Sequence, residues 1–461
     1  MTASSTSGAY PGRSAVTGWI LFDCATQPVF TLITTFIFAP FFAARLAESP
    51  VEGQALWGFA TGAAGLAIAL LSPVLGAVAD AAGQRKPWIA AFSVLIVTGC
   101  ALLWFAVPGA EYSVPLAMFA FAMATIGAEF AAVFTNAMMP TLVPPEKLGR
   151  LSGTGWAVGY VGGLFSLIAM LVFFVANPET GRTLAGLSPV FGLDPAAGEG
   201  DRAAGPLSAL WYLVFVLPLF LFTPDTPRLQ AVTTAISQGL STLKATIASA
   251  RSQKNVFTYL LAHMIYADGL VGLFAFGGIY ATGIFGWSTT EIGSFGILLT
   301  ITGALGAWLG GKIDDRFGPK AVVLGAITGL TLASIGILST TANSILFGIE
   351  VAPPVPGDGL FAAPAEQFYL LCGLLIGAVA GQLQAASRTL LIRISPEEKI
   401  TQFFGLYALS GKVTSFLSPV LVGVVTALAA SQRAGMTVLI GFFVVGAILL
   451  LLVKVPPARR A

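Results

Sequence analysis

Long apolar stretches recur along the whole of this 461-residue chain and limit what it can fold into. Apolar residues make up 56% of the sequence and charged residues only 10%, whereas a soluble domain carries about 25% charged residues. Apolar stretches of 18 or more residues are typical of transmembrane helices. They are continuous rather than alternating, so they do not fit an outer-membrane β-barrel. We therefore predict an all-α membrane protein.

Twelve transmembrane helices are predicted from these stretches. Their expected spans are 17–44, 56–79, 87–107, 113–138, 150–175, 207–223, 255–284, 291–310, 319–340, 367–392, 401–427 and 436–454. A long loop separates the sixth helix from the seventh. We predict two six-helix halves, residues 1–223 and 255–461, joined by a cytoplasmic linker, residues 224–254.

The Lys and Arg residues orient these helices. With the N-terminus in the cytoplasm, nearly all of them fall on the cytoplasmic side, as the positive-inside rule requires. The exceptions are Arg45, Arg182, Arg202 and Arg433 on the other side and Lys412 inside a helix. The first 16 residues lack the pattern of a cleavable signal. We expect both termini in the cytoplasm of a multi-pass protein of the bacterial inner membrane.

One loop pattern occurs twice, at half-chain spacing. Residues 76–86 have the pattern G-x-x-x-D-x-x-G-x-R-K, and residues 311–320 have G-x-x-x-D-R-x-G-x-K. Internal repeats of this kind are the usual framework of a secondary transporter. The loops are predicted either to latch a cytoplasmic gate or to serve as plain topogenic turns. The expected gate residues are Gly76, Asp80, Gly83, Arg85, Gly311, Asp315, Arg316 and Gly318.

Ionisable residues inside the membrane are costly and by default mark a polar pathway or an internal pair. Asp268 and Lys412 lie at similar predicted depth, ~20 Å into their helices at 1.5 Å per residue. We expect them to pair, either as a structural lock or as part of a substrate or proton site. His263, the single histidine of the chain, suits proton coupling or a structural hydrogen bond.

The remaining candidates lie on other helices. Glu129 and Asn136 share one helix face, and Glu129 needs a partner from another helix or is protonated. Asp23 and Gln27 precede Pro28, which frees a backbone carbonyl at depth. Gln384 and Arg388 come near the end of the tenth helix, where Arg388 binds an anion or extends to the interface.

Several other classes of protein are disfavoured. The three cysteines, Cys24, Cys100 and Cys372, lie within predicted helices, so no disulfide is expected. A net charge of +2 leaves no basic surface for nucleic acid. One histidine, no Cys/His cluster and no phosphate-binding glycine loop argue against an enzyme, a bound metal or a cofactor.

The doubled loop and the 6+6 helices resemble the major facilitator superfamily. Within it, the chain is similar to the branch of the fungal autophagy-related vacuolar amino-acid effluxers and their bacterial relatives. The segments that carry this resemblance are residues 19–23, 148–163, 266–269, 381–388 and 403–412. The resemblance implies a transporter fold in which helices 1, 4, 7 and 10 line a central cavity, with amino acids as the default substrate class.

These observations together predict a monomeric secondary transporter that moves a small polar or zwitterionic solute by alternating access, coupled to protons. Two alternatives remain at this stage. One is a non-transporting assembly factor or sensor on a transporter scaffold, which needs no charged, water-filled cavity. The other is a lipid-handling protein with a basic headgroup site.

Overall fold

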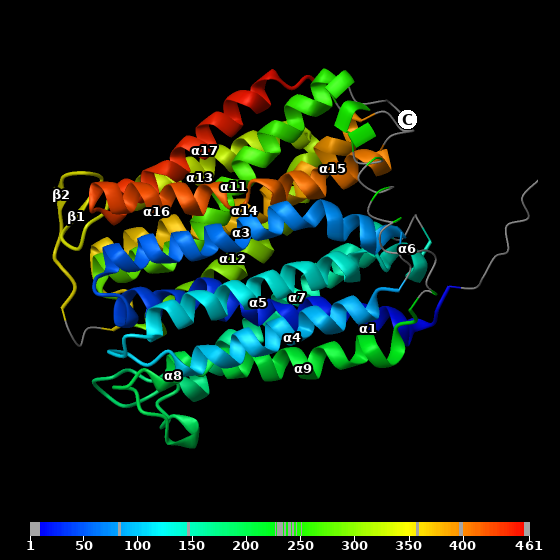
Figure 1. The fold of residues 1–461 in the computed structure, drawn as a ribbon. Coiled ribbons are helices and arrows are strands. Elements are labelled where there is room, and N and C mark those ends of the chain that lie inside the picture. Colours follow the sequence, from blue (N-terminus) through cyan, green and yellow to red (C-terminus); the bar gives the residue numbers. More distant parts are fainter. Residues whose placement is uncertain are drawn as a thin grey trace, which may run out of the picture.

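The structure is a computed structural model that describes residues 10–81, 84–144, 148–225, 251–355, 359–395 and 400–455, with scattered positions between 227 and 249. Long helices lie side by side in one bundle (Figure 1). Within the described residues, 11 helices are long and apolar enough to cross a membrane. The predicted span 291–310 is the 29-residue helix α12 (Thr289–Phe317), ~44 Å long at 1.5 Å per residue. The predicted all-α membrane fold is confirmed.

The first six spans are built from long helices and a few shorter segments. The first span comprises α1 (Arg13–Pro28), η1 (Val29–Phe36), α2 (Phe38–Phe41) and η2 (Phe42–Leu46). The others are α3 (Pro50–Ala81), α4 (Lys86–Leu102) with η3 (Leu103–Phe105), α5 (Ser113–Asn136), α7 (Leu148–Ala169) with η5 (Met170–Phe174), and α9 (Ala204–Phe222). The connections hold α6 (Met139–Leu142), η6 (Val190–Gly192) and α8 (Glu199–Arg202).

The second six spans are also built mainly from long helices. They are α11 (Lys254–Phe285), α12, α13 (Pro319–Leu338), α14 (Pro364–Ile394), α15 (Ile400–Val413) continued by α16 (Leu417–Ala429), and α17 (Gln432–Leu452). The loop after α13 carries a small antiparallel hairpin, β1 (Ser344–Ile345) with β2 (Ile349–Glu350), in which Ser344 pairs with Glu350.

The bundle has two distinct ends (Figure 1). The start of α1 and the end of α17 lie together at one end, which we call the termini end. The β1–β2 hairpin and α8 lie at the opposite end, which we call the hairpin end. Since α3 and α16 pack against each other along the bundle, these two helices form a main contact between the six-helix halves.

The eleventh span differs from its predicted continuous helix, 401–427. It is interrupted between the end of α15 at Val413 and the start of α16 at Leu417. Pro419 explains the break, because a proline has no N–H to donate to the carbonyl four residues earlier and its ring clashes with that carbonyl. This proline was the signal in the sequence that a break would occur here.

Pro28 interrupts the first span in a different way. It leaves the carbonyl of Cys24, four residues earlier, without its helical donor. The indole N–H of Trp211 on α9 donates to that carbonyl at 2.9 Å. After Pro28 the chain continues as the wide turns of η1, where the hydroxyl of Thr34 donates to the Val29 carbonyl at 3.0 Å. The predicted free carbonyl is therefore present, and it binds a side chain from another helix.

This arrangement predicts that Pro28 and Trp211 are energetically coupled. Trp211→Phe should lower the thermal stability of the purified protein, because a lost hydrogen bond that leaves a buried carbonyl unpaired costs about 1–3 kcal/mol. In a Pro28→Ala background the same change should cost much less, since the introduced alanine supplies a backbone N–H to the Cys24 carbonyl. Melting temperatures of the four proteins form a double-mutant cycle. Equal losses in both backgrounds would contradict the account.

Candidate functional site

The predicted residues Asp23 and Gln27 lie on the face of α1 that meets α7. Three glycines of α7, spaced four apart, allow the close approach. A Cβ atom at Gly155 would clash with a carboxyl oxygen of Asp23, and one at Gly163 would lie 2.7 Å from Cγ of Gln27. At Gly159 it would lie 3.4 Å from both side chains. The glycine pattern in the fifth span therefore positions these two polar groups.

Lys412 and Glu129 form an ion pair that joins the two halves. Glu129 projects from α5 and Lys412 from α15, and their side chains are 22% and 39% exposed, respectively. The expected pairing of Asp268 with Lys412 is therefore wrong, because the partner of Lys412 is Glu129. The position of a residue along its predicted helix indicates how deep Asp268, Lys412 and Glu129 lie in the membrane. It does not indicate how each helix is rotated about its axis, and this rotation decides which side chains face each other.

Asp268 instead lies almost completely buried on α11, with 1% of its surface exposed. Neither of its carboxyl oxygens has a hydrogen-bond partner among the described residues. The hydroxyl of Thr414, at the break in the eleventh span, is its polar neighbour. Burying a carboxyl group is costly, and Thr414 is the polar group that lies beside this one.

His263 belongs to a network of aromatic and hydroxyl side chains that links α11, α14 and α15. Its Nδ1 atom lies 2.9 Å from the hydroxyl oxygen of Ser410. Ser410 donates its own proton to the Tyr407 carbonyl at 2.8 Å, so the histidine nitrogen must be the donor. The imidazole also packs on Tyr407, with ring centroids 4.0 Å apart. The neighbouring Tyr266 hydroxyl lies 2.7 Å from the Ser387 hydroxyl.

Arg388 and Gln384 extend from the same face of α14. Among the described residues, no acidic side chain is found in an ion pair with Arg388. Its guanidinium lies beside the hydroxyl of Tyr407. Gln384 lies against the Tyr160 hydroxyl of α7, which is also close to Arg388.

Tyr160 was not singled out as a site residue from the sequence. It is 45% exposed and reaches across from the first half to α14 of the second. The signal was available, because Tyr160 follows Gly159 in the glycine-rich stretch of the fifth span. Two groups of polar contacts thus join the halves, Glu129 with Lys412 and Tyr160 with Gln384 and Arg388, and we refer to these five residues together as the inter-half polar site.

The structure brings some of the predicted residues together and separates others. Glu129 and Lys412 are in direct contact, and Gln384 and Arg388 share one neighbour. Asn136 is the last residue of α5 and is exposed, and no contact joins it to Glu129. Next to it, the Thr135 carbonyl accepts a 2.7 Å hydrogen bond from the indole of Trp19, which ties α5 to α1.

The two halves also meet at the hairpin end. There the hydroxyl of Thr289, at the start of α12, donates to the Asp201 carboxylate of α8. The Gln54 amide of α3 donates to the Thr426 hydroxyl of α16 at 2.8 Å. A Cβ atom at Gly278 of α11 would lie 2.9 Å from the Thr35 carbonyl of η1. Polar and backbone contacts therefore close this end.

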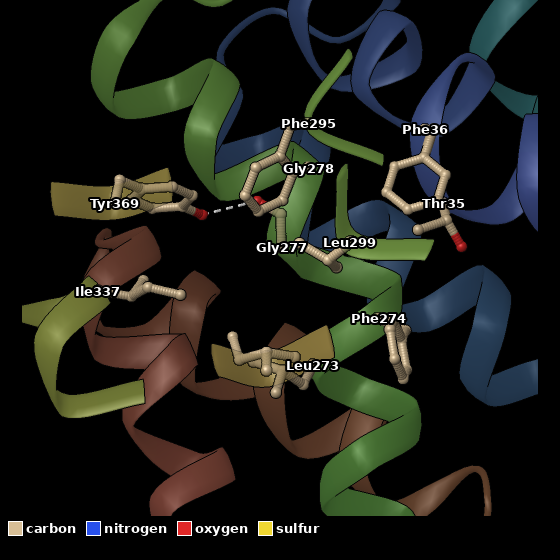
Figure 2. Close-up of a pocket in the computed structure, with 11 residues that line it drawn as sticks. Thr35, Phe36, Leu273, Phe274, Gly277, Gly278, Phe295, Leu299, Ile337 and Tyr369 are labelled. Carbon is tan, nitrogen blue, oxygen red and sulfur yellow. Dashed lines mark hydrogen bonds between the residues drawn. The ribbon is translucent and has the colours of Figure 1, made fainter. Parts of the chain in front are cut away.

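A small pocket lies inside this closed region (Figure 2). Its lining is mainly apolar and aromatic and comes from both halves, including Phe36, Phe274, Phe295 and Tyr369. Its cavity volume of about 20 Å³ is room for about one water molecule. The pocket is therefore too small for a solute, and it belongs to the packed contact between the halves.

The repeated loops are described in part. Gly83 lies outside the described residues, as do the side-chain surroundings of Gly76, Asp80, Gly311 and Asp315. Three gate residues are described: Gly318, Arg85 and Arg316.

Gly318 has φ +82°, a backbone conformation that favours glycine, as the predicted tight turn requires. Arg316 is exposed in the last turn of α12, with its guanidinium 5.2 Å from the centroid of the Phe317 ring. The backbone N–H of Arg85 donates to the Asp225 carboxylate at 2.9 Å. Asp225 thus caps the N-terminus of α4. This acidic residue belongs to the segment after α9 and not to the repeated loop.

The comparisons with known proteins agree with this architecture. Residues 54–461 match the family described as "Vacuole effluxer Atg22 like". The chain is 24% identical to an uncharacterized MFS-type transporter, YxiO, of Bacillus subtilis, over 94% of this chain and 93% of that one. It is 23% identical to autophagy-related protein 22 of Yarrowia lipolytica over 60% of this chain, and the match spans 45% of the fungal protein.

The fold has close counterparts among solved structures. The inward-open xylose transporter XylE from E. coli superimposes with a TM-score of 0.61 at 15% sequence identity, over 97% of this chain and 96% of that one. At this identity the likeness shows the fold. It confirms the predicted major facilitator architecture. The family match and the likeness to the transporter YxiO support the prediction that the chain is a transporter and not an enzyme. The family match covers most of the sequence, and the chain belongs to the Atg22-like vacuole effluxer family.

Proposed function

We propose that this protein is a secondary active transporter that moves a small polar or zwitterionic solute through the inter-half polar site by alternating access. The observation that carries the proposal is the Glu129–Lys412 ion pair, which joins opposite halves while both side chains remain partly exposed. An ion pair that bridges two bodies can open when they move apart, and a solute of matching charge can replace either partner.

The chemistry of the site favours a zwitterion. Lys412 and Arg388 offer cationic donors to a carboxylate, and the Arg388 fork suits bidentate binding. Glu129 offers an acceptor to an ammonium group, while Tyr160 and Gln384 supply neutral hydrogen bonds. Amino acids satisfy this pattern and are our default substrate class.

The arrangement of the halves supports alternating access. The contacts between α8 and α12 and between α3 and α16 close the hairpin end, so solute would enter from the termini end in this state. We propose that the termini end is cytoplasmic in a bacterial inner membrane, on the distribution of Lys and Arg. Residues 1–223 and 255–461 would then be the two moving bodies of a monomer, with residues 224–254 as linker and the repeated loops as the cytoplasmic gate.

The structure offers less support for the alternative of a non-transporting scaffold. That alternative expects dry, mutually paired charges. The Glu129–Lys412 pair is mutually paired but is not dry, given its exposure. We further propose that His263 is a structural residue, because the network with Ser410 and Tyr407 satisfies its Nδ1 atom and packs its ring.

Removing the ion pair should abolish transport without unfolding the protein. A substrate is first found by thermal stabilisation of the purified protein across a panel of metabolites. In proteoliposomes, Lys412→Ala and Glu129→Gln should each reduce exchange of that substrate by at least about 100-fold, the range expected for a loss of about 3 kcal/mol of binding. The matched control is Lys454→Ala, an exposed lysine at the termini end, which should transport at the wild-type rate. Wild-type rates in both site variants, at normal melting temperatures, would refute the role of the pair.

Proton coupling is proposed at Glu129, because it is a partly exposed carboxylate whose ammonium partner belongs to the other half. An imposed pH gradient across proteoliposomes should change the initial rate of net flux severalfold, and a protonophore should remove that difference. Flux that is the same with and without the gradient would exclude the proton as the coupling ion and leave the transport proposal intact.

A further inference from the structure

Arg388 and Lys412 are the two cations of the inter-half polar site, and they differ in their partners. Lys412 forms an ion pair with Glu129, whereas no acidic side chain among the described residues forms an ion pair with Arg388. Neutral hydroxyls, those of Tyr407 and Tyr160, lie close to its guanidinium. A carboxylate of the solute can therefore bind Arg388 without displacing an acidic side chain of the protein.

The phenol of Tyr407 presents its oxygen to Arg388 as a hydrogen-bond acceptor. Tyr407 on α15 is hydrogen-bonded both to Arg388 and to the Ser387 side chain of α14. Ser387 donates its own proton to the Leu383 carbonyl at 2.6 Å, so toward Tyr407 its oxygen must be the acceptor. The phenol proton is thus directed to Ser387. A guanidinium only donates, so the phenol oxygen accepts from Arg388.

The ring of Tyr407 is held in place by two rings of α11. The imidazole of His263 packs on it with ring centroids 4.0 Å apart, and the Tyr259 ring lies nearly parallel to it, 7° between the planes, at 6.5 Å. Both neighbours are themselves hydrogen-bonded, His263 to the Ser410 hydroxyl and Tyr259 to the Ser387 carbonyl. The phenol oxygen is therefore fixed relative to α11, α14 and α15.

We propose that Tyr407 is a positioning residue that orients the Arg388 guanidinium for the carboxylate of the solute. An arginine side chain has many rotamers, and holding it in one of them lowers the entropic cost of binding. Tyr407 and Arg388 belong to the same half, so their contact does not depend on how the halves are arranged. The contact of Arg388 with Tyr160 of α7 does, because it crosses between the halves.

This inference rests on the proposed transport function and deepens it. It assigns the carboxylate to Arg388 rather than to the Glu129–Lys412 pair, and it names the residue that sets the geometry of that contact. It also gives the His263 network a role, because that network holds the Tyr407 ring.

The test measures solute exchange by the full-length protein in proteoliposomes. The probes are the common L-amino acids, each paired with its α-carboxamide analogue, and thermal stabilisation of the wild type first identifies which of them binds. Tyr407→Phe keeps the ring but removes its hydroxyl. It should raise the KM for the carboxylate roughly tenfold, which corresponds to about 1.4 kcal/mol, with little change in the maximal rate. The KM for the carboxamide should stay the same.

Arg388→Ala should abolish the preference for the carboxylate over the carboxamide. In that background Tyr407→Phe should have no further effect on KM, since its proposed role acts through the guanidinium. The matched control is Tyr266→Phe, which removes a phenol hydroxyl that also lies 2.7 Å from the Ser387 oxygen. It should leave both KM values unchanged.

Three results would overturn the inference and leave the transport proposal intact. One is a Tyr407→Phe protein with the wild-type KM, or with the same rise in KM for carboxylate and carboxamide. The second is an Arg388→Ala protein that still prefers the carboxylate, a measurement that also decides the matter if Tyr407→Phe does not fold. The third is exchange of a solute that has no carboxylate while no amino acid binds. A wild type that exchanges no solute at all would instead contradict the transport proposal itself.

Discussion

The interior of a bilayer offers no water to pair with polar groups, so each one must find a partner within the protein or bind a ligand. Most of this chain meets the requirement with regular helices. Where Pro28 removes a helical donor, the indole of Trp211 replaces it, and where α4 begins, Asp225 caps the exposed N–H groups. The same physical rule thus explains how the scaffold is stabilised where its regular helices are interrupted.

The contacts between the halves fall into two kinds. At the hairpin end they are backbone approaches at small residues, apolar packing around Phe36 and Phe295, and individual hydrogen bonds such as Gln54 to Thr426. At the inter-half polar site they are charged and partly exposed. Closely packed surfaces tend to have discrete arrangements. A charged contact responds to solute or protons. In the proposed cycle, the packed contacts at the hairpin end close the passage, and the charged contacts at the inter-half polar site respond to the solute.

Much of the fold could be predicted from the sequence, because hydropathy, helix length and the doubled loop depend on local pattern. Pro28 alone was enough to predict a backbone carbonyl without its helical donor, which is the carbonyl of Cys24. The partner of Lys412 could not be predicted, because depth along a helix is readable from sequence whereas its rotation in the bundle is not. Tyr160 was missed for a related reason, since its importance lies in its contact with Gln384 across the halves. The break after Val413 was readable from Pro419 and was overlooked.

The central claim is that the hairpin end must open during transport. It is tested most directly by replacing Asp201 and Thr289, whose side chains are in contact, with cysteines and cross-linking them, since the native cysteines are buried. The account predicts that oxidation of the double-cysteine protein in proteoliposomes stops substrate exchange and that a reductant restores it. Each single-cysteine variant should be unaffected by oxidant. Exchange at the uncross-linked rate after complete cross-linking would contradict alternating access by this interface.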